Sequence, residues 1–322
     1  MMAEGNALSS HTATAAKKNH THLEIFPKKG AWTFLETIIT ISTPFCIWGL
    51  TGNGIVWWLL CCRIKKTKFT VYVLNLAVAD LIVLFYFSMV FILYLSSLHA
   101  NIYFLRVMEI MYLLGYNSSI YLLTAVSAVR CLMVFFPVWC QFHLPKHLSE
   151  TVCAILWSVS CLVSLVVYIV CYPRFLPSLK EGTFSCNVAY TFEIVNLLGV
   201  FPIMAFSTLA LFITTQKKVP QTPPAGLDVI IMATVALVLI FASSIRITDV
   251  IMHWDQKQDG PTLFLLSLLF DSVNSSVKPF VYLCVGCWKR KEAWESTHMI
   301  LEKALKDEGN RAARTQADQE HA

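Results

Sequence analysis

Charged residues are scarce in this chain: only 14% of its 322 residues are Asp, Glu, Lys or Arg, whereas 56% are hydrophobic. A soluble domain of this length would carry more charge, and the mean hydropathy of +0.60 is typical of an integral membrane protein. The net charge of +5 is modest, and no basic run is interleaved with exposed aromatic residues. We therefore expect the lipid bilayer as a partner and no nucleic acid.

The sequence motifs of common enzymes are also missing. The chain holds no HExxH, no GxSxG and no Gly-rich phosphate-binding loop, and it has no His and Cys set at metal-ligand spacing. The eleven Cys residues lie mostly within apolar runs, where a free thiol behaves as a small hydrophobic group. We predict no enzymatic activity, no cofactor and no metal site.

The N-terminal region lacks the apolar stretch of a cleavable signal peptide. Residues 1–31 are polar and rich in Ser, Thr, His, Lys and Ala, which predicts a disordered tail. Asn19-His20-Thr21 is an N-glycosylation sequon, so Asn19 is a candidate glycosylation site if the tail is extracellular.

Seven long apolar segments follow this tail. Each reaches the about 20 residues that a membrane-spanning helix needs, and none alternates apolar and polar residues as a membrane strand would. The sequence therefore predicts an all-α membrane protein with a seven-helix transmembrane domain over residues 32–286. The segments run approximately Trp32–Cys62, Phe69–Ser97, Ile102–Phe136, Thr151–Tyr172, Val188–Thr215, Leu227–Trp254 and Thr262–Gly286.

The basic residues of the loops predict the orientation of the bundle. By the positive-inside rule, loops rich in Lys and Arg lie in the cytoplasm, which places the N-terminal tail outside a multi-pass plasma-membrane protein. The four Lys residues of the tail argue the other way, and the agreeing loops outweigh them. The basic residues lie in the first, third and fifth loops and after the seventh segment: Arg63, Lys65, Lys66, Lys68, Lys146, Lys217, Lys218, Lys289, Arg290 and Lys291.

The C-terminal region predicts one further helix. Apolar residues recur at helical spacing from Ile300 to Leu305, so we expect residues 287–306 to form a cytoplasmic amphipathic helix along the membrane surface. Residues 307–322 are polar and predict a cytoplasmic tail. Cys284 and Cys287 are candidates for palmitoylation, and unmodified thiols at a helix end are an equal alternative.

The seventh segment carries polar and ionisable residues at membrane depth. Asp271, Asn274 and Lys278 would be costly in lipid, so they must face a polar interior and have partners there. Pro279 frees a backbone carbonyl and bends the helix, which is tolerated only where neighbours satisfy that carbonyl. This segment therefore predicts a packed polar core within the bundle.

Several residues along the membrane region resemble the landmark positions of class A, rhodopsin-like G-protein-coupled receptors. Further stretches, among them Leu122–Arg130, Asn274-Ser-Ser and Phe280–Gly286, resemble the Mas-related receptor family, above all the branch of the Mas receptor itself. The resemblance implies a rhodopsin-like receptor fold, an extracellular peptide or small charged ligand, and a heterotrimeric G protein as partner. The landmarks are Gly52-Asn53, Leu76 to Asp80, Arg130-Cys131, Trp157, Pro202 and Pro279-x-x-Tyr282.

The resemblance assigns Arg130 and Tyr282 to G-protein coupling. In class A receptors a preceding acid holds this arginine in the inactive state, whereas Val129 precedes it here. We therefore expect a weaker restraint on the inactive state and a raised basal activity. The alternative is that Arg130 only extends its charge to the membrane interface.

The resemblance also predicts a polar core made of Asn53, Asp80, Ser119, Asn274 and Lys278. In class A receptors the acid of the second segment usually holds a sodium ion, and Lys278 stands where an Asn or Asp is usual. Our hypothesis is that the Lys278 ammonium replaces this ion beside Asp80. The alternative is that Lys278 reaches the cytoplasmic water layer.

Candidate residues of the ligand pocket lie in the outer half of the bundle. Tyr112 occupies the aspartate position of amine receptors, so we do not expect an aminergic ligand. Arg246 either contacts the ligand or is neutralised by an acid of the bundle. The candidates are Glu109, Tyr112, Tyr116, Glu193, Arg246, Asp249, Leu268 and Asp271.

The resemblance further implies a disulfide bond between Cys171 and Cys186, and two free thiols are the alternative.

Ala242 and Ser244 replace the usual Trp and Pro of the sixth segment. These departures, together with Val129 and Lys278, keep open a decoy or scaffold receptor that does not signal. A membrane transporter is a less favoured alternative, because no internal repeat relates the two halves of the chain.

Overall fold

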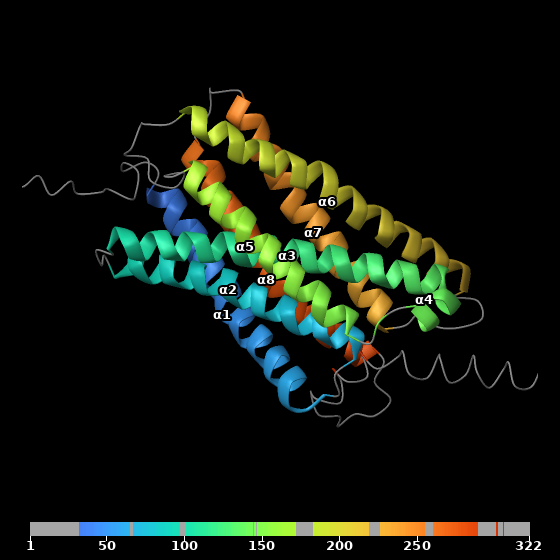
Figure 1. Ribbon diagram of the computed structural model, residues 1–322. Helices are drawn as coiled ribbons and strands as arrows, with labels where there is room; N and C mark the ends of the chain where they lie inside the picture. Colours follow the sequence, from blue (N-terminus) through green and yellow to red (C-terminus); the bar gives the residue numbers. More distant parts are fainter. Residues whose placement is uncertain are drawn as a thin grey trace, which may run out of the picture.

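A computed structural model shows the fold as a bundle of long helices (Figure 1). It describes residues 32–64, 67–96, 101–143, 145, 147–171, 183–218, 226–254, 260–288, 301 and 305, and among these residues there is no strand. The long helices are α1 Trp32–Cys62, α2 Lys68–Leu95, α3 Ile102–Phe135, α5 Leu148–Cys171, α6 Thr183–Lys218, α7 Gly226–Trp254 and α8 Gly260–Trp288.

Each predicted apolar segment coincides with one of these long helices, which confirms the all-α membrane fold. Over the described residues, α1, α2, α3, α5 and α6 are long and apolar enough to cross a membrane. The described part of α7 contributes a shorter apolar stretch, Gly226–Phe241. A short helix that the sequence did not predict, α4 Pro137–His143, follows α3. Pro137 begins it, at the first helical position, where the missing N–H has no intrahelical partner to lose.

Helix α3 runs through the middle of the bundle and packs against α2, α5, α6 and α7 (Figure 1). Asn101 caps its N-terminus, with its Oδ1 accepting a hydrogen bond from the Tyr103 N–H at 3.0 Å. Helix α8 packs against α1, α2 and α7. Polar groups on α3 and α8 therefore lie close to several other helices at once.

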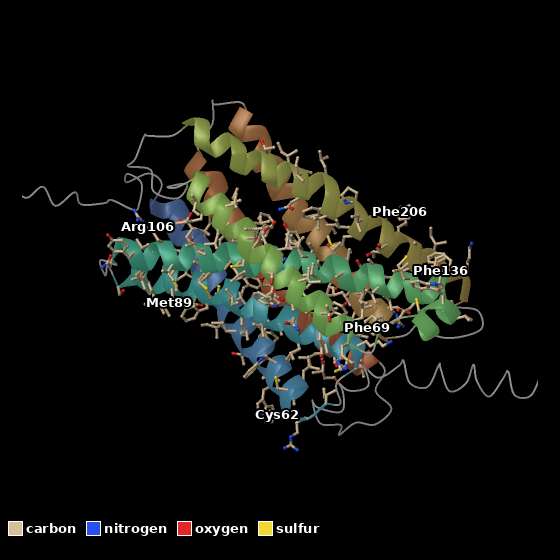
Figure 2. The ribbon with its side chains drawn as sticks, viewed as in Figure 1. Cys62, Phe69, Met89, Arg106, Phe136 and Phe206 are labelled. Carbon is tan, nitrogen blue, oxygen red and sulfur yellow. The ribbon has the colours of Figure 1, made fainter. Side chains whose placement is uncertain are left out.

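The interior holds two apolar clusters, and large apolar side chains also cover the outer surface. One cluster surrounds Phe69, Leu123 and Tyr282, and the other surrounds Phe87 and Tyr112. On the outside, Phe206 is 75% exposed on the outer face of α6 (Figure 2). Such an apolar exterior is what a lipid-facing surface requires.

Helices α1 and α8 approach each other closely because glycine lines the contact. A Cβ atom at Gly49 would collide with Ser276, and one at Gly52 would lie 2.9 Å from Pro279 Cβ. The close approach brings Asn53 Nδ2 within 3.0 Å of the Ser275 carbonyl oxygen. That carbonyl is the one that Pro279, which lacks an N–H, leaves without its helical donor. Asn53 thus satisfies the backbone group that the proline frees.

The predicted C-terminal helix lies mostly outside the described residues. Leu301 and Leu305 are helical and buried in the cluster around Phe69. Whether residues 287–306 follow the membrane surface stays a prediction. The tails at 1–31 and 307–322, including Asn19, also lie outside the described part of the chain.

Replacing Asn53 by Ala should destabilise the bundle, because the buried Ser275 carbonyl would lose its donor. The expected loss is about 1–3 kcal/mol, which lowers the midpoint of thermal unfolding of the detergent-solubilised protein. Thr51→Ala is the control, since the Thr51 hydroxyl is exposed and bonds only to the Ile47 carbonyl of its own helix. Equal midpoints for the two variants would contradict this role of Asn53.

Candidate functional site

A buried ion pair joins three helices near the middle of the bundle. Lys278 of α8 donates from Nζ to Asp80 Oδ1 of α2 at 2.7 Å and to Ser119 Oγ of α3 at 2.6 Å. Ser119 Oγ lies 3.2 Å from the same Asp80 oxygen. The side chains of Lys278 and Asp80 are both 0% exposed. The ammonium therefore lies against Asp80 rather than in cytoplasmic water.

The Lys278 ammonium lies beside Asp80, as the sequence predicted. A buried charge of either sign is stable at membrane depth only with a partner of opposite sign. Asn274 is also buried, 7% exposed, on the same helix. The role of Lys278 as a substitute for sodium stays a prediction.

A second buried ion pair lies near the C-terminal end of α3. Arg130 Nε contacts Asp228 Oδ1, in the first turn of α7, at 2.5 Å. The guanidinium also lies 5.3 Å from the centre of the Phe69 ring of α2. Arg130 is 5% exposed and Asp228 is 2% exposed, so neither extends into the interface.

Asp228, the partner of Arg130, was not predicted from the sequence. The neighbour of Arg130 in the chain is Val129, which is partly buried and packs against the cluster around Phe69. The acid that holds Arg130 comes from α7 instead. Its position at the start of the sixth apolar segment was an available signal, because an acid is stabilised in the first turn of a helix.

A third polar contact, between α3 and α8, lies nearer the N-terminal end of α3. Tyr112 donates its hydroxyl hydrogen to Asp271 Oδ2 at 2.6 Å, and both residues are buried. The Tyr112 ring stacks on Tyr86 of α2, with centroids 4.8 Å apart, and also contacts Phe87. The structure therefore brings Tyr112 and Asp271 together and adds two aromatic residues that the sequence did not single out.

The structure describes two further candidate residues of the ligand pocket. Glu109 is buried, 8% exposed, and Tyr116 lies next to Tyr112 with ring centroids 6.2 Å apart. The remaining candidates have side chains outside the described part of the structure, and so does the predicted disulfide. They are Glu193, Arg246, Asp249, Leu268, Cys171 and Cys186.

Further polar pairs fix α3 against α5 and α6. Asn117 Nδ2 donates to Ser164 Oγ of α5 at 3.1 Å, and the Tyr121 hydroxyl donates to Asn196 Oδ1 of α6 at 2.8 Å. Tyr282 is 1% exposed and packs in the cluster around Phe69. Within the residues that the structure describes, no group of three His, Cys, Asp or Glu side chains could hold a metal ion. The polar groups thus connect helices to one another.

These features define a membrane protein of seven long helices with a buried polar core and a buried charge pair between α3 and α7. The family model for the 7 transmembrane receptor (rhodopsin family) matches residues 52–282. The chain is 36% identical to the proto-oncogene Mas of Rattus norvegicus over 266 residues, which cover 81% of each chain.

A second relative is the Mas-related G-protein coupled receptor member D of Macaca fascicularis. It is 34% identical over 270 residues, which cover 82% of this chain and 83% of the relative. The chain therefore belongs to the Mas-related family of class A G-protein-coupled receptors. It is a multi-pass plasma-membrane receptor and not an enzyme.

Breaking the central ion pair from one side should cost far more than removing it from both sides. Lys278→Met leaves the Asp80 carboxylate buried without a cation, with an expected loss of about 3–5 kcal/mol. The double variant Asp80→Leu with Lys278→Met should recover most of that loss, because no buried charge remains. The measurement is the midpoint of thermal unfolding of the two single variants, the double variant and the wild type.

The control is Lys217→Met, which removes an exposed cation at the end of α6 and should leave the midpoint unchanged. A double variant whose loss equals the sum of both single losses would show that the two side chains are not coupled.

Proposed function

We propose that this receptor is activated by a peptide or small charged ligand from outside and stimulates nucleotide exchange on heterotrimeric G proteins. The N-terminus lies outside, so the end of α3 that carries Arg130 faces the cytoplasm. The observation that carries the proposal is the buried contact between Arg130 and Asp228. It joins α3 to α7 by a charge pair at the face where a G protein would bind.

The same contact supports a specific account of the inactive state. A buried charge pair stabilises the arrangement in which α3 and α7 are close, and separation of the two helices would expose Arg130 to a cytoplasmic partner. Because residue 129 is Val, the preceding position supplies no second acid. We propose that Asp228 carries the charge restraint and that basal activity is raised relative to a receptor with acids at both positions.

The polar contacts of the outer half support the class of ligand. Tyr112 and Asp271 form a buried pair, and Glu109 lies on the same helix as Tyr112, about one turn away. Acids and aromatic rings in one region favour a ligand with a charged group over a purely apolar one. Since the position of the amine-receptor aspartate is Tyr112, a simple aminergic ligand is not proposed.

A decoy receptor that does not signal is the alternative suggested by Val129, Lys278 and the altered sixth segment. It is not favoured, because the arginine is present and held by an acid of α7, as a switch between two states requires. Nucleotide exchange measured in membranes that contain the chain and a panel of G proteins separates the two functions. A complete lack of exchange under every condition, in correctly folded protein, would support the decoy.

Replacing Asp228 by Asn should raise basal nucleotide exchange. The loss of about 1–2 kcal/mol from the inactive state changes the ratio of active to inactive receptor about five- to thirtyfold. Val129→Glu should act in the opposite direction, because it adds a second acid beside Arg130. Exchange is measured without ligand, at equal receptor amounts in the membrane.

The matched control is Glu150→Gln, which changes an exposed acid at the cytoplasmic end of α5 that, among the described residues, pairs with His147 at 3.3 Å. Its basal exchange should equal that of the wild type, since exposed pairs contribute little. Unchanged exchange in Asp228→Asn would remove Asp228 from the proposed restraint.

Replacing sodium by potassium in the buffer should not change agonist affinity or basal exchange in the wild type. The physical reason is that the Lys278 ammonium already neutralises Asp80, so a sodium ion would meet a second cation. Lys278→Asn removes that cation and should make exchange sensitive to sodium. A wild-type receptor that responds strongly to sodium, or a sodium ion bound at Asp80, would contradict this role.

A further inference from the structure

Among the residues that the structure describes, four of the five exposed cysteines lie near the ends of two neighbouring helices. Cys61 and Cys62 are the last two residues of α1, and both thiols are exposed. Cys284 and Cys287 are exposed within the last two turns of α8, which packs against α1. By contrast, the buried cysteines lie within the packed bundle: Cys46, Cys140 and Cys153.

The surroundings of Cys61 and Cys62 are those of a membrane–water boundary. Trp57 and Trp58 precede them and are 44% and 48% exposed. The guanidinium of Arg63, the next residue, lies 5.9 Å from the centre of the Trp58 ring. Exposed Trp followed by a basic residue is typical of the interface. Cys62 lies at the free tip of α1 (Figure 2).

The packing of α1 against α8 gives a second measure, independent of the Trp residues, of how far along the bundle these thiols lie. Gly49 faces Ser276 and Gly52 faces Pro279. Both pairs have the same offset in sequence, so the two helices run parallel in one register. Cys61 lies about 13 Å beyond Gly52 along α1, and Cys287 lies about 12 Å beyond Pro279 along α8, at a rise of about 1.5 Å per residue. Cys61, Cys62 and Cys287 therefore lie at nearly the same depth, and Cys284 lies about one helical turn deeper in the bundle.

A disulfide between Cys61 and Cys62 does not account for them. Consecutive Cα atoms are about 3.8 Å apart, below the about 4.4–6.8 Å that a disulfide spans, and both residues are helical. The orientation proposed above also places them at the cytoplasmic face, where thiols are kept reduced. They are therefore free nucleophiles at the surface of the membrane.

We propose that Cys61 and Cys62 are sites of S-acylation by long-chain fatty acids, an inference that rests on the proposed orientation. The Cys sulfur attacks the thioester carbonyl of a long-chain acyl-coenzyme A. A new thioester bond forms, the bond from the carbonyl to the coenzyme sulfur breaks, and the thiol proton passes to the released coenzyme thiolate. No oxidant or reductant takes part.

The chains would enter the bilayer beside Trp57 and Trp58 and hold the tip of α1 at the cytoplasmic surface. An acyl chain needs an attachment point at the boundary, because its thioester lies near water while its tail lies in hydrocarbon. The basic first loop, which begins at Arg63, adds attraction to anionic lipid headgroups there. Two acylated thiols and a basic residue thus act together at one helix end.

The test counts thioesters on the full-length receptor expressed in cultured animal cells. Free thiols are blocked, thioesters are cleaved with hydroxylamine, and each released thiol takes one polyethylene glycol maleimide tag. The variant Cys61→Ser with Cys62→Ser should lose two tags relative to the wild type, one for each thiol. A variant with an unchanged tag number would overturn the proposal.

The matched control is Cys161→Ser, because Cys161 is exposed on α5 but lies midway along that helix, at the depth of the hydrocarbon. It should leave the tag number unchanged. If the Cys61 and Cys62 double variant fails to fold, the wild type still gives the answer. Trypsin releases the peptide Gly30–Arg63 from it, and mass spectrometry shows whether an acyl group is on Cys61 or Cys62. A fully unmodified peptide overturns the proposal.

A membrane-impermeant maleimide applied to intact cells separates this proposal from the orientation on which it rests. Labelling of Cys61 or Cys62 from outside would overturn both the orientation and the acylation. No labelling from outside together with no thioester would overturn the acylation alone. Ligand-free nucleotide exchange, measured in the same cells, reports on the proposed receptor function independently of the tag number.

Discussion

The ion pair between Lys278 and Asp80 is the contact on which the arrangement of the bundle depends. Neither charge could remain at membrane depth without the other, so α2 and α8 must meet at this level and exclude lipid. Ser119 of α3 completes the contact and brings the central helix to the same point. A hydrophobic contact could slide by a residue at little cost, whereas this charge pair fixes the relative height of three helices.

Pro279 is tolerated within α8 because Asn53 of α1 supplies the hydrogen-bond donor that the proline lacks. The glycines of α1 let the two helices approach, and Asn53 then reaches the Ser275 carbonyl. Each feature needs the others, since a larger side chain at Gly52 would push α8 away and leave that carbonyl without a donor. The features of α1 and the polar residues of α8 are therefore one structural unit, although more than 200 residues separate them in the chain.

The long helices could be predicted from the sequence, because each needs only a run of apolar residues of sufficient length. The contact of Lys278 with Asp80 was also expected, since a cation at membrane depth requires an acid and the resemblance supplied one. Asp228 was missed because its partner lies 98 residues away and the expected partner was the neighbour at 129. The stacking of Tyr86 on Tyr112 could not be predicted, because aromatic residues are frequent in every apolar segment and only packing selects the pair.

Three polar residues of α3 lie on one face of that helix. Tyr112, Ser119 and Arg130 are spaced by seven and eleven residues, and at about 100° per residue these spacings bring all three within about 20° of one another. Tyr112 and Ser119 contact α8, through Asp271 and Lys278, whereas Arg130 contacts α7. Helix α8 is thus held to α3 by polar contacts at two heights, whereas the charge pair with α7 lies near the C-terminal end of α3. Under the proposed function, a change that separates Arg130 from Asp228 would move the start of α7 while the polar contacts keep α3 and α8 together.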